Sequence, residues 1–254
     1  NPETKILLNW FRANRYAGSK DRQAIRDLVF NCLRYKFSCA WPFEKAGFPL
    51  SGRVIVLGML TISNLSIDKV FDDKKYSPKN LSKLEKNVIQ TFEQSLSGAP
   101  TYIKLNFPNF LEKSLKESFG ERFLENVLSL STQANLFIRV NCIKSNIDDV
   151  VVSLNEEGIK TERISNFNNC LKVIENKQKI MNSKVYLSGK IEIQDFSSQA
   201  VVNFIDPQTN TKILDFCAGG GGKTLAMASL TNGTAEFFVH DVNSSKISNL
   251  QKRC

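Results

Sequence analysis

Apolar residues recur with the period of an α-helix through most of the first 130 positions. From Asp21 onward the apolar positions are Ala24, Ile25, Leu28, Val29, Cys32 and Leu33. This spacing predicts a helix with one apolar face. The same pattern predicts helices at 54–65, 81–96 and 107–130, with a polar, lysine-rich segment at 72–80 between the first two of these. We therefore expect an all-α domain over residues 1–130.

Short strands and helices alternate in the next part of the chain. Residues 136–140 form an apolar run typical of a strand, and residues 147–154 have helical spacing that Gly158 would end. Two further short apolar runs, 185–187 and 191–193, predict strands. We expect a small α+β domain over residues 131–193.

Strands separated by a helix characterise the last part of the chain. An apolar helix is expected over 200–205, a strand before Asp215, a helix after it, and a second strand over 235–240. Such alternation indicates a parallel sheet. A doubly wound sheet normally has more strands than the two predicted here, and helices cover both of its faces. We therefore expect residues 194–254 to be the N-terminal, incomplete part of a Rossmann-like domain, with the chain stopping inside its second helix.

The segment 213–224, Ile-Leu-Asp-Phe-Cys-Ala-Gly-Gly-Gly-Gly-Lys-Thr, contains the strongest candidate for a binding site. Glycines allow backbone N–H groups to approach a ligand that a Cβ would block. Asp215, Gly219 and Gly221 have the Asp-x-x-x-Gly-x-Gly spacing of S-adenosylmethionine (SAM) sites in Rossmann-like methyltransferases. Asp241 follows the next predicted strand, where folds of this kind place a carboxylate for ribose hydroxyls.

Three alternatives remain open for this segment. A P-loop requires Gly-x-x-x-x-Gly-Lys-Ser/Thr, but Cys217 stands where its first glycine belongs. A dinucleotide-binding turn needs a third glycine, and Thr224 occupies that position. The third alternative is a glycine-rich turn without a ligand, although four consecutive glycines cost backbone entropy.

The charge balance is basic. The sequence has 34 Lys and Arg against 25 Asp and Glu, a formal net charge of +9, which favours a polyanionic partner and RNA first. Six basic residues cluster in and before the first long predicted helix: Arg12, Arg15, Lys20, Arg22, Arg26 and Arg34. Trp10, Tyr16 and Tyr35 lie near them and could stack on bases, so RNA contact stands beside the alternative of a solvated face.

Cysteine and histidine usage indicates a reduced protein without a zinc site. The six cysteines form no Cys-x-x-Cys pair, and His240 is the only histidine. We expect free thiols and a cytoplasmic location. The apolar runs are too short to span a membrane, and the first residues lack a signal-peptide pattern. Neither a metal nor a membrane is expected as a partner, and the oligomeric state stays open.

Taken in order, four motifs resemble those of the NOL/NOP/Sun family of RNA (cytosine-carbon-5) methyltransferases, and within it the bacterial 16S rRNA enzymes. The segment 15–22, Arg-Tyr-Ala-Gly-Ser-Lys-Asp-Arg, resembles the start of the family's NusB-like RNA-binding domain. Residues 137–141, Phe-Ile-Arg-Val-Asn, resemble the Leu-Arg-Val-Asn pattern of its middle domain. Residues 194–199, Gln-Asp-Phe-Ser-Ser-Gln, resemble its Gln-Asp-x-Ala-Ser-Gln signature, and 215–224 resemble its SAM loop.

The resemblance implies a cofactor site. The glycine loop, which we define as residues 217–223, would hold the methionine and ribose part of SAM, and Asp241 would bind the ribose hydroxyls. The cofactor-binding residues expected are Cys217, Ala218, Gly219, Gly220, Gly221, Gly222, Lys223 and Asp241. One departure is that Gly219 and Gly220 stand where the family usually has Ala or Gly followed by Pro. Glycine there still permits close backbone approach.

The same resemblance implies an enzyme whose chemistry uses two cysteines. A thiolate attacks carbon 6 of a flipped-out cytosine, which makes carbon 5 nucleophilic toward the SAM methyl group. A second cysteine, in an Asp-Ala-Pro-Cys motif, assists product release. Neither cysteine motif occurs in residues 1–254, so we expect no catalytic residue here and no turnover by this chain alone. The alternative function is a noncatalytic NusB-like RNA-binding module with a degenerate Rossmann tail.

Overall fold

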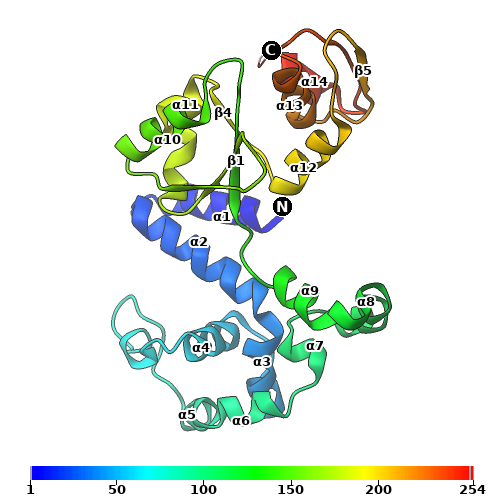
Figure 1. The fold of residues 1–254 in the computed structure, drawn as a ribbon. Coiled ribbons are helices and arrows are strands. Elements are labelled where there is room, and N and C mark those ends of the chain that lie inside the picture. Colours follow the sequence, from blue (N-terminus) through cyan, green and yellow to red (C-terminus); the bar gives the residue numbers. More distant parts are fainter. Residues whose placement is uncertain (1, 252, 254) are drawn as a thin grey trace. The chain divides into compact units, whose positions relative to one another are not determined.

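The computed structural model describes residues 2–251 and 253, and these form two compact units, 1–133 and 134–254. The first unit is built from helices and the second contains both sheets (Figure 1). The segments expected as a middle domain and a Rossmann-like part both fall mainly within the second unit. The three-domain division stays a prediction.

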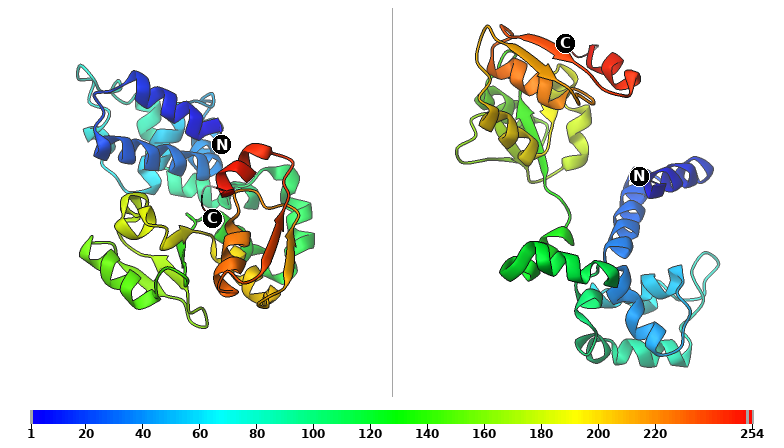
Figure 2. Two further views of the ribbon diagram at one scale, coloured as in Figure 1. Left: turned by 90° about the horizontal axis from the view of Figure 1, so that it is seen from above. Right: turned by 90° about the vertical axis from the view of Figure 1, so that its right-hand side faces the viewer.

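The first unit contains nine α-helices and three short 3-10 turns among the described residues (Figure 2). The helices are α1 (Pro2–Ala13), α2 (Ser19–Arg34), α3 (Lys36–Lys45), α4 (Gly52–Ile62), α5 (Lys83–Gln90), α6 (Phe92–Ser97), α7 (Thr101–Lys104), α8 (Glu112–Phe119) and α9 (Phe123–Leu130). The 3-10 turns are Ile67–Lys69, Asn109–Leu111 and Gly120–Arg122. The predicted helical character of this part is confirmed.

Two of the long predicted helices are interrupted. The expectation of one helix over 107–130 is wrong, because Gly120 adopts φ +52° and separates α8 from α9. The helix expected over 81–96 is split at Thr91, which has φ −102° and ψ 12° between α5 and α6. Apolar spacing continues across both breaks, so periodicity alone did not reveal them.

Helices α3 and α4 pack closely at the centre of the first unit. Phe43, Leu57 and Phe92 are buried in its main core. Gly58 allows the two backbones to approach, since a Cβ at this position would lie 2.3 Å from the carbonyl oxygen of Cys39. This glycine is therefore required by packing.

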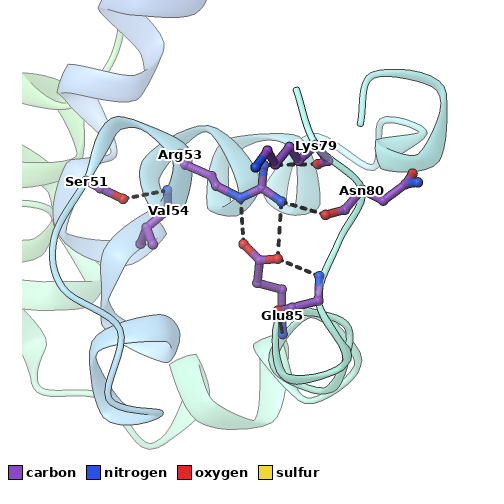
Figure 3. A network of polar contacts seen from close by, with 7 residues as sticks. Ser51, Arg53, Val54, Lys79, Asn80 and Glu85 are labelled. Atoms are coloured by element: carbon purple, nitrogen blue, oxygen red, sulfur yellow. Dashed lines mark hydrogen bonds and ion pairs between the residues drawn. The ribbon is translucent and has the colours of Figure 1, made fainter. Parts of the chain in front are cut away.

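An ion pair between half-buried Arg53 and buried Glu85 holds the end of the lysine-rich segment 72–80 beside α4 and α5 (Figure 3). Arg53 Nε donates to Oε1 of Glu85 at 2.7 Å, and its Nη groups donate to the carbonyl oxygens of Lys79 and Asn80 at 3.1 and 3.2 Å. The guanidinium also lies 4.7 Å from the ring centroid of Phe71. Arg53 and the Ser82 N–H hold the pKa of Glu85 at about 2, well below its usual range.

The second unit begins with a four-stranded antiparallel sheet in the order β2-β3-β1-β4. Its strands are β1 (Leu136–Val140), β2 (Thr161–Arg163), β3 (Cys170–Val173) and β4 (Ile191–Ile193). Its helices are α10 (Ile147–Glu156), the 3-10 helix Lys177–Asn182 and α11 (Lys184–Leu187). The predicted strands at 136–140 and 191–193 and the helix from 147 are confirmed.

The strand expected at 185–187 is wrong, because those residues lie in α11. Ser183 caps this short helix by accepting a hydrogen bond from the Tyr186 N–H at 3.3 Å. Val185 is buried in the core while Leu187 is exposed. A three-residue apolar run does not distinguish a strand from one helical turn.

The two faces of this sheet have different chemistry. Ile138 and Val140 point into an apolar core with α10 and α11. Arg139 is paired in register with Glu192 on β4, so these two side chains lie on the opposite face. Helix α12 (Phe196–Ile205) packs on that side, where the rings of Phe196 and Phe137 are 5.6 Å apart (Figure 1).

Two parallel strands complete the second unit. They are β5 (Lys212–Asp215) and β6 (Glu236–Val239), with α13 (Gly222–Leu230) between them and α14 (Ser244–Gln251) after them. Val202 of α12, Ala226 and Met227 of α13 form a small core that packs with Ile213 and Phe237. The predicted parallel pair is confirmed, and on its other face Leu214 is 64% exposed.

Candidate functional site

The glycine loop and Asp241 meet at one edge of the β5–β6 pair. Asp215 is paired in register with Val239, so the loop after β5 and Asp241 after β6 both leave from the carboxyl ends of the strands. Parallel α/β sheets bind their ligands at this edge. Backbone bonds continue the pairing outward, from His240 N–H to the Asp215 carbonyl at 2.9 Å and from Ala218 N–H to the His240 carbonyl at 2.9 Å.

Two glycines of the loop have backbone conformations that other residues rarely adopt. Gly219 has φ +56° and Gly221 has φ +80°. At Gly221 there is also no space for a side chain, because a Cβ would lie 2.2 Å from Cδ1 of Leu250 in α14. Gly221 N–H donates to the Ala218 carbonyl at 2.8 Å, which closes the turn just before α13 begins.

The Asp241 carboxylate is joined directly to the loop. The Gly219 N–H donates to Oδ2 of Asp241 at 2.8 Å, and the Asn243 N–H donates to Oδ1 at 2.9 Å. The N–H groups of Asn243 and Gly219, with Lys246 at 3.9 Å, hold the pKa of Asp241 below its usual range. A carboxylate has about four acceptor positions. Asp241 therefore stays ionised and can accept further hydrogen bonds from a ligand.

A second carboxylate closes the base of the loop. Thr224 Oγ1 donates to Oδ2 of Asp215 at 2.7 Å, and Thr224 is 4% exposed. In a P-loop the corresponding hydroxyl would bind Mg²⁺. Here the hydroxyl bonds to the first carboxylate of the motif, which joins the start of α13 to the end of β5.

The remaining predicted site residues differ in exposure. Cys217 and Lys223 are exposed, and Ala218 is buried beneath the loop. Gly220 is exposed, and Gly222 is half-buried as the first residue of α13. His240 is exposed, with its ring stacked on that of Phe216 at a centroid distance of 4.6 Å. The structure thus brings the whole loop and Asp241 to one edge.

Residues outside the predicted set also contact the loop. Leu250 packs against Gly221, and Arg253 Nη1 donates to the Gly220 carbonyl at 2.5 Å. Nε2 of Gln194, between β4 and α12, lies 3.5 Å from where a Cβ on Gly222 would be. No spacing rule connects these residues to the loop, because they come from other elements.

Among the ion pairs found between described residues, none involves any of the six clustered basic residues of the first unit, and one of the six has a structural role. Arg22 Nε donates to the Ala17 carbonyl at 2.8 Å, and its guanidinium lies 5.7 Å from the Phe11 ring centroid. The other five are Arg12, Arg15, Lys20, Arg26 and Arg34. Tyr16 is 80% exposed and contacts Trp10 edge-on, with ring centroids 6.4 Å apart. The structure thus shows a contact between a basic and an aromatic residue here, Arg22 with Phe11, and leaves the ring of Tyr16 exposed.

Two further findings concern metals and membranes. Over residues 2–251 and 253, His, Cys, Asp and Glu form no group of three or more that could hold a metal ion. Among the helices that the structure describes, none is both long and apolar enough to cross a bilayer.

Comparisons with known proteins identify a matching domain and related sequences. Residues 107–180 match the ferredoxin-like domain of RsmF/B-like methyltransferases. The ribosomal RNA small subunit methyltransferase B of Citrobacter koseri is 23% identical over 248 residues, covering 90% of this chain and 58% of that protein. The 25S rRNA (cytosine-C(5))-methyltransferase nop2 of Schizosaccharomyces pombe is 28% identical, covering 66% of this chain and 28% of that protein.

A solved structure shares the fold. The methyltransferase homolog protein from Pyrococcus horikoshii superposes with a TM-score of 0.55 at 22% sequence identity, covering 60% of this chain and 50% of that one. These findings define the class of protein as one related to RNA methyltransferases. The matched domain and the rRNA methyltransferase relatives support assignment of the chain to the NOL/NOP/Sun family. It spans less than two thirds of the length of the relatives described above.

Proposed function

We propose that this chain binds SAM at the glycine loop and Asp241, and that it serves methylation of cytosine at carbon 5 in ribosomal RNA, with 16S rRNA as the substrate. The family and the names of its relatives support the reaction type. The small-subunit enzyme of Citrobacter koseri supports the 16S substrate, and the yeast relative supports carbon 5 of cytosine.

The observation that carries the proposal is the bond from the Gly219 N–H to the Asp241 carboxylate at 2.8 Å. It fixes the loop beside an ionised acid at the ligand-binding edge of parallel strands. In the proposed complex Asp241 accepts hydrogen bonds from the two ribose hydroxyls. The exposed end of the loop, with Cys217 and Gly220, lies against the methionine part of SAM, because glycine permits close contact.

The chain's own residues provide binding rather than bond formation. Methyl transfer to carbon 5 needs a cysteine nucleophile at carbon 6 of the base. The family motifs Asp-Ala-Pro-Cys and Thr-Cys do not occur within residues 1–254. We therefore assign SAM and RNA binding to this chain and no catalytic residue to it.

RNA binding is proposed for the basic surface of the first unit. The formal net charge of +9 attracts polyanions. Five basic residues without ion pairs among the described residues lie in α1, in α2 or in the turn between them, the same part of the chain that carries the exposed rings of Trp10 and Tyr16. Basic side chains contact phosphates and aromatic rings stack on unpaired bases, so this combination suits single-stranded RNA.

Calorimetric titration of the chain with SAM, and with unmodified rRNA, tests the proposal. Wild type should bind both ligands. Asp241→Asn should bind SAM about tenfold more weakly, the factor expected when one hydrogen bond to a charged group is lost. Asp148→Asn, on the exposed start of α10, is the matched control and should leave the affinity unchanged. RNA binding without SAM binding would instead support the noncatalytic module.

A further inference from the structure

One cation is buried in an interior strand of the four-stranded sheet. Arg139 on β1 is 2% exposed, and burial lowers the pKa of its guanidinium. Its Nε donates to Oε1 of Gln194 at 2.8 Å. Its Nη1 has no hydrogen-bond partner among the residues that the structure describes. A buried charge with incomplete hydrogen bonding costs free energy, and an apolar side chain of similar size is often equally stable or more stable.

Gln194 connects this guanidinium to the start of α13. Its backbone N–H donates to the Phe137 carbonyl at 3.3 Å, and its carbonyl accepts from Gln199 Nε2 at 2.9 Å. The backbone of Gln194 is thus held by both β1 and α12. Its side-chain Nε2 lies beside Gly222, where a Cβ would be 3.5 Å away. One end of the Gln194 amide therefore bonds to Arg139, and the other end occupies the space beside the first residue of α13.

The same sheet holds α13 and its loop at two further points. The Cys142 N–H, just beyond β1, donates to Oγ of Ser229 at 3.0 Å, and Ser229 is 6% exposed near the end of α13. Glu192 on β4 forms an ion pair with Arg253, which also donates to the Gly220 carbonyl. Residues of the sheet therefore hold the helix near both ends.

We infer that Arg139 is a positioning residue for the glycine loop, acting through Gln194 on Gly222. The opposite, apolar face of the sheet packs with α10 and α11 to form the core. The buried cation on the other face is therefore not needed for that core. Its contact instead sets where α13 begins, and hence where the backbone N–H groups of the loop point. The consequence for SAM rests on the proposed function, whereas the consequence for the loop does not.

Hydrogen exchange of the unliganded full chain tests the inference. Arg139→Met removes the charge but keeps the side chain's length and apolar volume. Amides in peptides spanning 216–225 should exchange about tenfold faster than in wild type, the factor that one lost hydrogen bond to a charged group corresponds to. The thermal midpoint should stay within a few degrees of wild type, because a buried charge is removed. Arg163→Met on β2, an exposed ion-paired position, is the control and should change neither quantity.

Two further variants separate positioning from a general structural role. Gln194→Glu keeps an acceptor oxygen for Arg139 and places an oxygen of similar size where Nε2 lies beside Gly222, so it should preserve the slow exchange of the loop. Gln194→Ser shortens the link and leaves space for water, so it should accelerate loop exchange even if Arg139→Met does not fold. Unchanged loop exchange in Arg139→Met, or faster exchange spread equally over the whole unit, would overturn the inference.

A SAM titration of the same variants separates failure of the inference from failure of the proposed function. Arg139→Met should bind SAM about tenfold more weakly, and Gln194→Glu should bind it as wild type does. If wild type itself does not bind SAM, the proposed function fails while the exchange result still decides the role of Arg139. If wild type and Arg139→Met bind SAM equally, the inference fails while the proposed function stands.

Discussion

Replacing Gly221 by alanine should open the glycine loop, and the structure allows the cost to be worked out. Gly221 has φ +80°, a left-handed conformation that costs about 1–2 kcal/mol for a residue with a Cβ. The new Cβ would also lie 2.2 Å from Cδ1 and 2.9 Å from Cγ of Leu250, a residue that is 2% exposed. Leu250 must move by about 1 Å to reach an ordinary contact of about 3.5 Å.

Overpacking of this kind costs about 1–3 kcal/mol. We use the lower value because the crowded atom, Cδ1 of Leu250, is at the end of a flexible side chain. The sum for Gly221→Ala is about 2–3 kcal/mol of lost local stability. Gly220→Ala is the matched control, because Gly220 lacks a positive φ and the nearest atom to its Cβ is Arg253 Nη1 at 3.9 Å. That variant should be neutral or slightly stabilising, since it restricts the unfolded chain.

The assay must report on residues 134–254. Both tryptophans, Trp10 and Trp41, lie in the first unit, so their fluorescence does not follow the loop. Hydrogen exchange of peptides from α13 and α14 does. A cost of about 2 kcal/mol corresponds to roughly thirtyfold faster exchange, at 1.4 kcal/mol for each factor of ten. Equal exchange in Gly221→Ala and Gly220→Ala would refute the reasoning.

Two further predictions concern the first unit and are read from tryptophan fluorescence during urea unfolding. Glu85→Gln should lower the free energy of unfolding by about 2 kcal/mol at pH 7, because a hydrogen-bonded carboxylate partner of Arg53 is lost. Since the pKa of Glu85 is lowered from 4.5 to about 2, this contribution is present above pH 4.5 and is lost between pH 4.5 and 2. An equal acid-induced loss in Glu85→Gln would contradict that assignment. Gly58→Ala should cost about 1–3 kcal/mol, because its Cβ would lie 2.3 Å from the Cys39 carbonyl oxygen. Gly52→Ala, with nothing within 4 Å, is the control, and equal effects of the two substitutions would show that packing at Gly58 is not limiting.

Local pattern predicted most of the regular elements, and its errors have identifiable causes. The strand at 136–140 and the helix from 147 were recoverable because their period persists over several residues. The interruption at Gly120 was missed because apolar spacing resumes in α9. The run 185–187 was too short to show any period. The Ser183 side chain caps the first turn of these residues and so stabilises a helix.

The residues of the candidate site also fall into a predictable group and an unpredictable one. The glycine loop and Asp241 could be predicted because they occur in a recognisable order along the sequence. A strand is followed by a turn with glycines, a helix, and a carboxylate after the next strand. The residues that support the loop could not be predicted. Leu250 and Arg253 reach it from the last helix and just beyond it, and Gln194 reaches it from the end of β4.

The sequence by itself determined the helical character of the first part, the parallel strand pair, and the loop with its acid, because each depends on residues that are neighbours along the chain. The tertiary structure alone decided that Arg139 is buried, that it bonds to Gln194, and that Gly58 lets two backbones approach closely. Such contacts join residues that are distant in sequence. Their geometry is set by how faces of whole elements pack together, and periodicity contains no information about which faces meet.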